Sequence, residues 1–198
     1  MRLRLLSFAA LPLLLTACLT TRTAPAPDVV TVTDLDARGE DGHFTFYSLR
    51  DGAVVPVADS ASTEWDLAFK STTILVNGGT SGPGMGGAVV IDDTSFAAVT
   101  EAPPPEAYVV DEGTDRMETA IRGGAGNGWY DYDFATGIVS PRPVVLAVRT
   151  ADGHYAKVQI ESYYLGAPGP DEITPDAGFR FYTFRYLLQP DGSRALGE

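Results

Sequence analysis

Two segments near the C-terminus alternate with the period of a β-strand. In His154–Tyr164, one face carries small and apolar side chains, and the opposite face carries mostly polar and aromatic ones. The two faces are Ala156, Val158, Ile160, Ser162 and Tyr164 against Tyr155, Lys157, Gln159, Glu161 and Tyr163. Phe179–Gln189 alternates in the same way but has aromatic residues on both faces. We therefore predict two strands, of which the second is buried or half-buried on both sides.

Asp-Gly pairs stand where neighbouring strands would be joined. Asp152-Gly153 separates the apolar run Val144–Val148 from the first alternating segment. Asp41-Gly42 and Asp51-Gly52 bracket another candidate strand, His43–Arg50. Glycine readily adopts the positive φ that tight hairpin turns require. The pattern therefore predicts hairpins, and with them antiparallel strand pairing.

Helical signals are few in this chain. Asp93–Thr100 and Asp115–Arg122 are each long enough for two turns, and each begins with an aspartate suited to an N-cap. Two glycine-rich stretches, 77–87 and 123–128, are typical of long loops, and we expect the first to be mobile. Together these features predict an all-β fold of antiparallel sheets with long glycine-rich loops and at most two short helices.

The first residues have the pattern of a bacterial lipoprotein signal. Two arginines precede the apolar stretch Leu5–Leu15, which is too short to span a bilayer. Leu15-Thr16-Ala17-Cys18 then has the form of a lipobox. We predict that residues 1–17 are a signal peptide and that the thiol of Cys18 carries diacylglycerol. The alternative is an ordinary cleaved signal followed by a free thiol.

The residues after the predicted cleavage site form a short polar tether. Residues 18–28 contain two prolines, which favour extended backbone. No composition break or internal repeat follows, so we predict one β domain over residues 29–198. Leu19 follows the cysteine where aspartate would favour retention, and this indicates sorting to the outer membrane. The acyl chains would then be the chain's only attachment to that membrane.

Charge and cysteine content exclude several classes of protein. The chain has 14 Lys+Arg against 26 Asp+Glu, a net charge of -12 and a pI near 4.4. Nucleic-acid affinity rests on basic side chains that neutralise phosphates, so a nucleic-acid partner is not expected. The single cysteine excludes a disulfide within the chain.

Catalytic and nucleotide-binding motifs give no support for an enzyme. Gly82, Gly84 and Gly87 have dinucleotide-binding spacing, but the strand pattern Ala88–Ile91 follows them where the motif requires a helix. The sequence has no nucleophile elbow, Walker lysine or His-Glu-x-x-His motif. We therefore expect no chemical turnover.

The histidines and one aspartate pair are residue types that often bind metals, but their positions in the sequence do not indicate a metal site. His43 and His154 each follow an Asp-Gly turn, a position where a hairpin shows its side chain to solvent. Asp131 and Asp133 share a strand face and match no calcium-loop spacing. Neither pair predicts a metal site.

Six motifs occur in the order seen in the HmuY family of haem-binding lipoproteins, which the chain resembles from about Trp65 to Gln189. They are Trp65–Phe69, Asn77–Gly82, Gly128–Asp133, Arg149–Val158, Ser162–Tyr164 and Tyr182–Tyr186. The resemblance implies an all-β fold with long loops at one end and a lipid anchor on the outer membrane of a Bacteroidota-like bacterium. It also implies capture of haem for delivery to a TonB-dependent receptor.

The chain departs from the family at the metal ligands. Two histidines coordinate the iron in the best-known branch, and some relatives use methionines. A family histidine often stands in the turn after the Tyr-x-Tyr-Asp strand, whereas this turn is Ala135–Ile138 here. Haem iron accepts thioether ligands, and the lipidated Cys18 is not available to it. We therefore take Met85 and Met117, both in predicted loops, as candidate haem-iron ligands.

The sequence thus predicts a surface lipoprotein that binds haem or a related porphyrin for uptake through an outer-membrane receptor. The alternative is a structural or interaction lipoprotein that has the same scaffold and does not bind haem. The missing histidines favour the alternative, and the retained loops favour haem.

Overall fold

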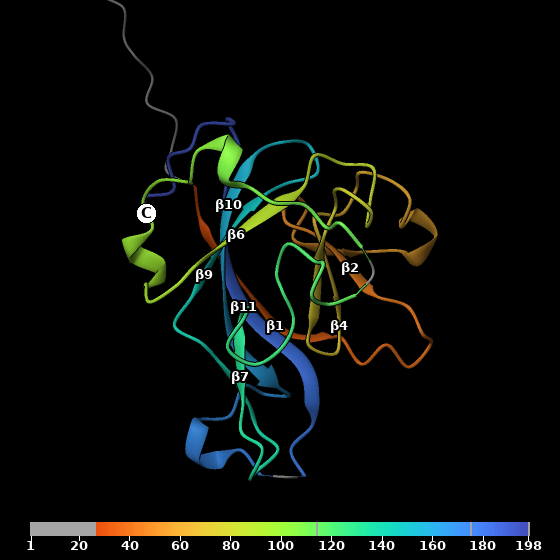
Figure 1. Ribbon diagram of the computed structural model, residues 1–198, viewed down its shortest axis with the longest axis vertical. Helices are drawn as coiled ribbons and strands as arrows, with labels where there is room; N and C mark the ends of the chain where they lie inside the picture. Colours follow the sequence, from red (N-terminus) through yellow and green to blue (C-terminus); the bar gives the residue numbers. More distant parts are fainter. Residues whose placement is uncertain (1–26, 114, 175, 198) are drawn as a thin grey trace, which may run out of the picture.

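A five-stranded antiparallel sheet follows the long axis of the molecule (Figure 1). The computed structural model describes residues 27–113, 115–174 and 176–197. The strand order in this sheet is β1 (Val29–Asp36), β11 (Phe179–Gln189), β10 (Tyr155–Tyr164), β9 (Val145–Arg149) and β6 (Gly87–Ile91). Every neighbouring pair is antiparallel, which confirms the predicted hairpin between β9 and β10.

A second, four-stranded sheet packs against the first. Its strand order is β3 (Ala53–Val55), β2 (Thr45–Ser48), β4 (Leu67–Lys70) and β5 (Thr73–Val76), again antiparallel throughout. A separate ribbon of β7 (Tyr130–Tyr132) and β8 (Val139–Pro141) lies at the lower end of the molecule in Figure 1. This ribbon is joined to the first sheet where the Val139 backbone N–H donates to the Tyr164 hydroxyl.

Aromatic rings from the two sheets meet to form the main core. The ring of Phe69 on β4 lies 5.0 Å from Tyr182 and 5.5 Å from Phe184, both on β11. On the opposite side of β11, Leu187 belongs to a second buried cluster that includes Phe96. β11 is therefore buried on both sides, as its two aromatic faces predicted.

Within residues 27–113, 115–174 and 176–197, helical structure is limited to single 3₁₀ turns. They are η1 (Val57–Asp59), η2 (Phe96–Ala98), η3 (Pro105–Ala107) and η4 (Pro170–Glu172). The prediction of an all-β antiparallel fold is confirmed. Among the described residues, no helix is long and apolar enough to cross a membrane.

Neither predicted helix forms as expected: the first is shorter than predicted, and the second is absent. Only η2 forms within 93–100, and its N-cap is Ser95, not Asp93. The segment 115–122 contains only bends and turns. Its backbone is bonded in other ways, because the Asp115 carboxylate accepts a hydrogen bond from the Met117 N–H and the buried Asp111 carboxylate accepts one from the Ala120 N–H. These side-chain bonds compete with the helical pattern.

Candidate functional site

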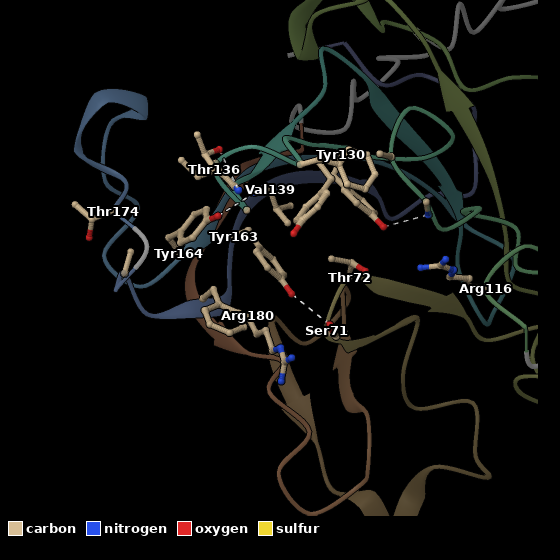
Figure 2. A pocket seen from close by; sticks show the side chains of 18 residues that line it. Ser71, Thr72, Arg116, Tyr130, Thr136, Val139, Tyr163, Tyr164, Thr174 and Arg180 are labelled. Atoms are coloured by element: carbon tan, nitrogen blue, oxygen red, sulfur yellow. Dashed lines mark hydrogen bonds between the residues drawn. The ribbon is translucent and has the colours of Figure 1, made fainter.

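A cavity of about 620 Å³ lies where the β7–β8 ribbon meets the end of β10 and the start of β11 (Figure 2). The turn between β4 and β5 forms another wall. Aromatic, small and hydroxyl-bearing side chains dominate the lining. The lining residues are Ser71, Thr72, Arg116, Gly124, Ala125, Tyr130, Tyr132, Phe134, Thr136, Gly137, Ile138, Val139, Tyr163, Tyr164, Thr174, Ala177, Phe179 and Arg180.

Irregular pairing between β10 and β11 places two tyrosines in this cavity. The strand register shifts between Ile160 and Ser162 and again before Tyr164. Such bulges bend a strand and redirect its side chains. Tyr163 and Tyr164 were predicted to lie on opposite faces, yet both are buried and both line the cavity. The alternation expected for this strand therefore fails at its last three residues, and the failure helps to build the site.

Hydrogen bonds hold the buried tyrosines in place. The hydroxyl of Tyr130 accepts from the Gly124 N–H at 3.1 Å, and that of Tyr164 accepts from the Val139 N–H at 3.0 Å. The Tyr163 hydroxyl lies 3.4 Å from the hydroxyl of Ser71. Burial raises the pKa of Tyr163, and the neighbouring Ser71 and Arg180 offset part of that rise. These contacts fix the positions of the three tyrosine rings in the cavity wall.

The rim of the cavity is aromatic and exposed. Phe134, in the turn after β7, is 88% exposed, and its ring meets Tyr132 edge-on at 5.0 Å between centroids. Phe179, the first residue of β11, also lines the cavity and is about half exposed. Exposed aromatic rings beside a concave site are typical of ligand contact surfaces. The turn 135–138 has no histidine at the place where the family resemblance led us to look for one. It contributes Thr136, Gly137 and Ile138 to the lining.

The charged groups of the lining are two arginines, Arg116 and Arg180, with no aspartate or glutamate among them. Arg180 sits at the irregular start of β11 with a φ of 70°, in the left-handed region that non-glycine residues seldom adopt. Its Nε atom is buried and has no hydrogen-bond partner. Its guanidinium carbon lies 5.0 Å from the centre of the Phe179 ring.

The two candidate methionines are exposed, and neither is part of the cavity lining. Met85 lies beside the β9–β10 hairpin, where its N–H donates to the carbonyl of Ala151 at 2.9 Å and its side chain borders Gly153. Met117 lies beside Gly124, at the edge of the cavity. No contact described for these residues joins the two thioethers, and their role as iron ligands stays a prediction. Cys18 and the signal peptide lie outside the residues that the structure describes.

The two histidines lie apart from the cavity. His43 is exposed near the Asp41-Gly42 turn. His154 is partly buried, with its Nδ1 atom 2.9 Å from a carboxylate oxygen of Asp152. Within the described ranges, no group of three or more His, Cys, Asp or Glu side chains is arranged to hold a metal ion.

The sequence did not identify the residues that build this cavity, although several lie within the recognised motifs. One signal in the sequence could have indicated the cavity: two consecutive tyrosines, Tyr163 and Tyr164, stand at the end of a predicted strand. Strict alternation would leave one of these large rings exposed, so a site that takes up both rings could have been expected. An arginine between two aromatic residues, Arg180, was another signal. The bulges that bring them together depend on the pairing of β10 with β11, which no local pattern specifies.

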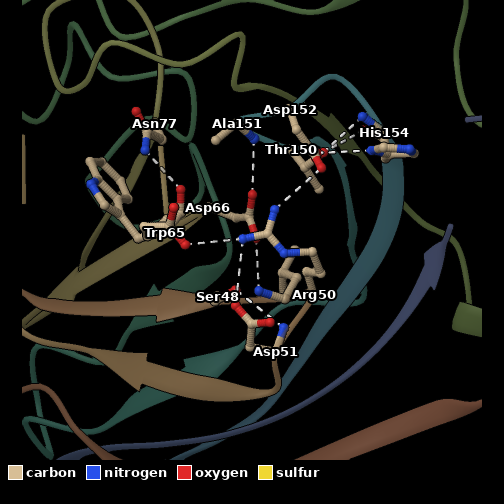
Figure 3. A network of polar contacts seen from close by, with 12 residues as sticks. Ser48, Arg50, Asp51, Trp65, Asp66, Asn77, Thr150, Ala151, Asp152 and His154 are labelled. Carbon is tan, nitrogen blue, oxygen red and sulfur yellow. Dashed lines mark hydrogen bonds and ion pairs between the residues drawn. The ribbon is translucent and has the colours of Figure 1, made fainter. Parts of the chain in front are cut away.

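The 77–87 loop, which we expected to be mobile, is held by hydrogen bonds around one buried side chain. The buried Asn77 side chain donates to the carbonyl of Trp65 (Figure 3). It also donates to the carbonyl of Ser62 and accepts from the Gly84 N–H. A Cβ atom on Gly82 would lie 2.1 Å from Asn77 Oδ1. The glycines here allow close packing around one buried amide, and the loop is held by defined hydrogen bonds.

Several solved bacterial proteins have the same fold. A candidate lipoprotein of Bacteroides fragilis is 20% identical, with a TM-score of 0.54, over 83% of this chain and 91% of that one. The apo HmuY analogue of Tannerella forsythia is 17% identical, with a TM-score of 0.53, over 84% and 100%. Apo PinO of Porphyromonas gingivitis is 14% identical, with a TM-score of 0.51, over 82% and 97%. At these identities the similarity establishes the fold alone.

Family membership rests on a separate match. No curated protein matches the chain. The family model of the HmuY protein, however, matches residues 40–172, about two thirds of the sequence. That range includes β2 to β10 and most of the cavity lining, and it ends before β11. The resemblance noted in the sequence is thereby confirmed, and the chain belongs to the HmuY family.

Proposed function

We propose that this protein binds haem, or a closely related tetrapyrrole, in the cavity between the β7–β8 ribbon and the ends of β10 and β11. The observation that carries the proposal is an aromatic cavity of about 620 Å³ in a member of this family. Small-molecule sites typically measure roughly 300–1,000 Å³ and are lined mainly by apolar and aromatic groups with a few polar ones. The cavity fits that description.

The cavity residues divide into two roles in this proposal. The buried rings of Tyr130, Tyr163 and Tyr164 provide an aromatic wall against which the macrocycle would pack. The exposed rings of Phe134 and Phe179 cover its edges. Axial coordination of the iron would have to come from groups near the cavity, since the lining holds no histidine, cysteine or methionine. Met117 lies at the edge beside Gly124, and Met85 would have to approach from the β9–β10 hairpin.

We further propose that the protein acts as a surface lipoprotein anchored through Cys18 to the outer membrane. The support is the lipobox at residues 15–18 together with family membership. Bound haem would pass unchanged to an outer-membrane receptor, so the protein would be a carrier and not an enzyme. Intact-mass analysis of protein extracted from membranes tests the anchor: we expect a chain that begins at Cys18 and carries acyl groups. An unmodified chain that starts elsewhere would refute it.

A second candidate function is a structural or interaction lipoprotein that binds no haem. The observation in its favour is the same absence of strong iron ligands from the cavity lining. In this case the exposed aromatic rim would contact another macromolecule.

Haem titration distinguishes the two functions. We would titrate ferric and ferrous haem into the chain from Thr20 onward, which contains every described residue, after circular dichroism has verified its folding. A saturable Soret band supports haem binding, and its absence in both redox states leaves the interaction function. If Met85 and Met117 coordinate the iron, binding strengthens on reduction, because soft thioether ligands favour ferrous iron. Met85→Ala and Met117→Ala should each then weaken it, whereas sensitivity to His43→Ala would identify a histidine ligand.

A further inference from the structure

The charge of the cavity is opposite to the charge of the protein. The chain has almost twice as many acidic as basic residues, yet the lining contains two arginines and no carboxylate. Most other arginines are paired: Arg38, Arg142 and Arg185 each lie within ion-pair distance of an acidic side chain. The ion pairs among the described residues include none between Arg116 or Arg180 and a carboxylate.

The two arginines are positioned on different walls. In Figure 2 they lie on either side of the turn that contains Ser71 and Thr72, with the rings of Tyr130 and Tyr163 next to this turn. Arg180 extends from β11, and Arg116 from the segment before the second glycine-rich loop. The guanidinium of Arg180 lies beside the Tyr163 hydroxyl, but its buried Nε has no hydrogen-bond partner and is a donor that a carboxylate in the cavity would satisfy.

The other polar groups of the lining are phenol and alcohol hydroxyls, which are weak metal ligands unless they ionise. The hydroxyls of Tyr130 and Tyr164 already accept backbone N–H groups. Burial disfavours the ionised form of Tyr163, whose pKa is raised. The lining therefore offers rings and guanidinium groups, and these recognise a flat anionic molecule whether or not it carries a metal.

We propose that this cavity recognises a tetrapyrrole by its flat ring and its two carboxylates, held by Arg116 and Arg180, and not by its metal. The inference rests on the proposed function and makes it more specific: iron-free protoporphyrin binds about as tightly as haem. The protein then collects dicarboxylate porphyrins in general.

The test compares three ligands: ferric haem, iron-free protoporphyrin IX, and the dimethyl ester of protoporphyrin IX, which keeps the ring and removes both charges. Quenching of the protein's tryptophan and tyrosine fluorescence measures all three. We expect protoporphyrin and haem to have dissociation constants within about threefold of each other, and the ester to bind at least about tenfold more weakly.

Variants of the two arginines then test whether these side chains bind the carboxylates of the ligand. Arg180→Gln and Arg116→Gln should each weaken protoporphyrin binding about tenfold, while the already weak ester binding changes little. Arg122→Gln is the matched control, because Arg122 is exposed, lies close to Arg116 in sequence and is not part of the lining. It should alter binding less than about twofold. Arg180→Lys, which retains the charge, verifies that losses at this position do not come from misfolding.

The outcomes separate this inference from the proposed function. Tight haem binding without protoporphyrin binding would overturn metal-independent recognition and leave haem binding intact. Equal binding of the ester, or no effect of either arginine variant, would overturn recognition through the carboxylates. Failure of all three ligands to bind would reject the proposed function itself.

Discussion

The two ends of β10 are built in opposite ways. At its first residues, the β9–β10 hairpin enters a network in which buried polar atoms are matched with partners (Figure 3). At its last residues, the strand borders a cavity with exposed rings at the rim and a buried arginine nitrogen that has no partner. Buried polar groups are usually satisfied, and exposed aromatic groups usually mark contact sites. We therefore expect one end to serve stability and the other to be the end at which the proposed ligand binds.

Asp66 is the centre of the closed end. Its carboxylate accepts the N–H of Leu49, after β2, at 2.8 Å and the N–H of Ala151, in the β9–β10 hairpin, at 2.9 Å. One side chain thus connects the two sheets. Burial raises the pKa of Asp66, and the two backbone N–H groups offset part of that rise.

The largest effect is expected for Asp66→Ala. The substitution leaves two buried N–H groups without partners, each costing roughly 1–3 kcal/mol, so the free energy of unfolding should fall by about 3 kcal/mol. Urea unfolding measures the change, with the exposed Asp59→Ala as the control. The affinity of the folded variant for haem should stay the same. A loss below about 1 kcal/mol would show that the network is not the structural centre.

A smaller effect is expected for Gly82→Ala in the loop around Asn77. The new Cβ would lie 2.1 Å from Asn77 Oδ1 and 2.9 Å from the Trp65 ring, so the buried amide has to move. Overpacking of this kind costs about 2 kcal/mol. Gly197→Ala, which meets no atom within 4 Å, is the control in the same unfolding measurement. If both variants have wild-type stability, the loop is as mobile as the sequence suggested.

The same contrast explains what could be predicted from the sequence. β11 forms over the residues that its alternation indicated, because strand period and hairpin glycines such as Gly153, with a φ of 89°, are local properties. The helix expected at 115–122 fails because Asp111, outside that segment, accepts the Ala120 N–H. The cavity was not foreseen because its bulges arise from long-range pairing between β10 and β11. The methionine ligands were chosen from loop position alone, and loop position does not specify which side chains meet.

The contribution of the β9–β10 hairpin to the free energy of unfolding should depend on pH, through Asp152. Burial acts to raise the pKa of Asp152, but hydrogen bonds from Thr150 and His154 outweigh it and hold the pKa at about 2. A carboxyl whose pKa is lowered on folding stabilises the protein above its unfolded pKa of about 4, and this contribution is lost as the pH falls toward 2. The side chain is about a third exposed, so the contribution should be below about 1 kcal/mol.

Asp152→Asn tests this effect. The variant should be less stable than the wild type at pH 6, and the difference in unfolding free energy should shrink between pH 4 and pH 2. Urea unfolding at pH 6 and pH 2.5 gives both values. A difference that is the same at both pH values would mean that the charge of Asp152 contributes nothing.

The smallest change in stability is expected at the open end, from Phe134→Ala. The ring is 88% exposed and touches mainly Tyr132, so its removal should alter the free energy of unfolding by less than about 0.5 kcal/mol. Because the ring borders the cavity, its removal should still weaken haem or protoporphyrin binding about fivefold, which corresponds to about 1 kcal/mol. Val109→Ala, also exposed but outside the cavity lining, should change neither quantity. Asp66→Ala and Phe134→Ala then form a cross-comparison in which one variant loses stability at constant affinity and the other loses affinity at constant stability. If Phe134→Ala lowers stability as much as affinity, the rim is part of the packed structure and the two ends of β10 are not divided between stability and binding.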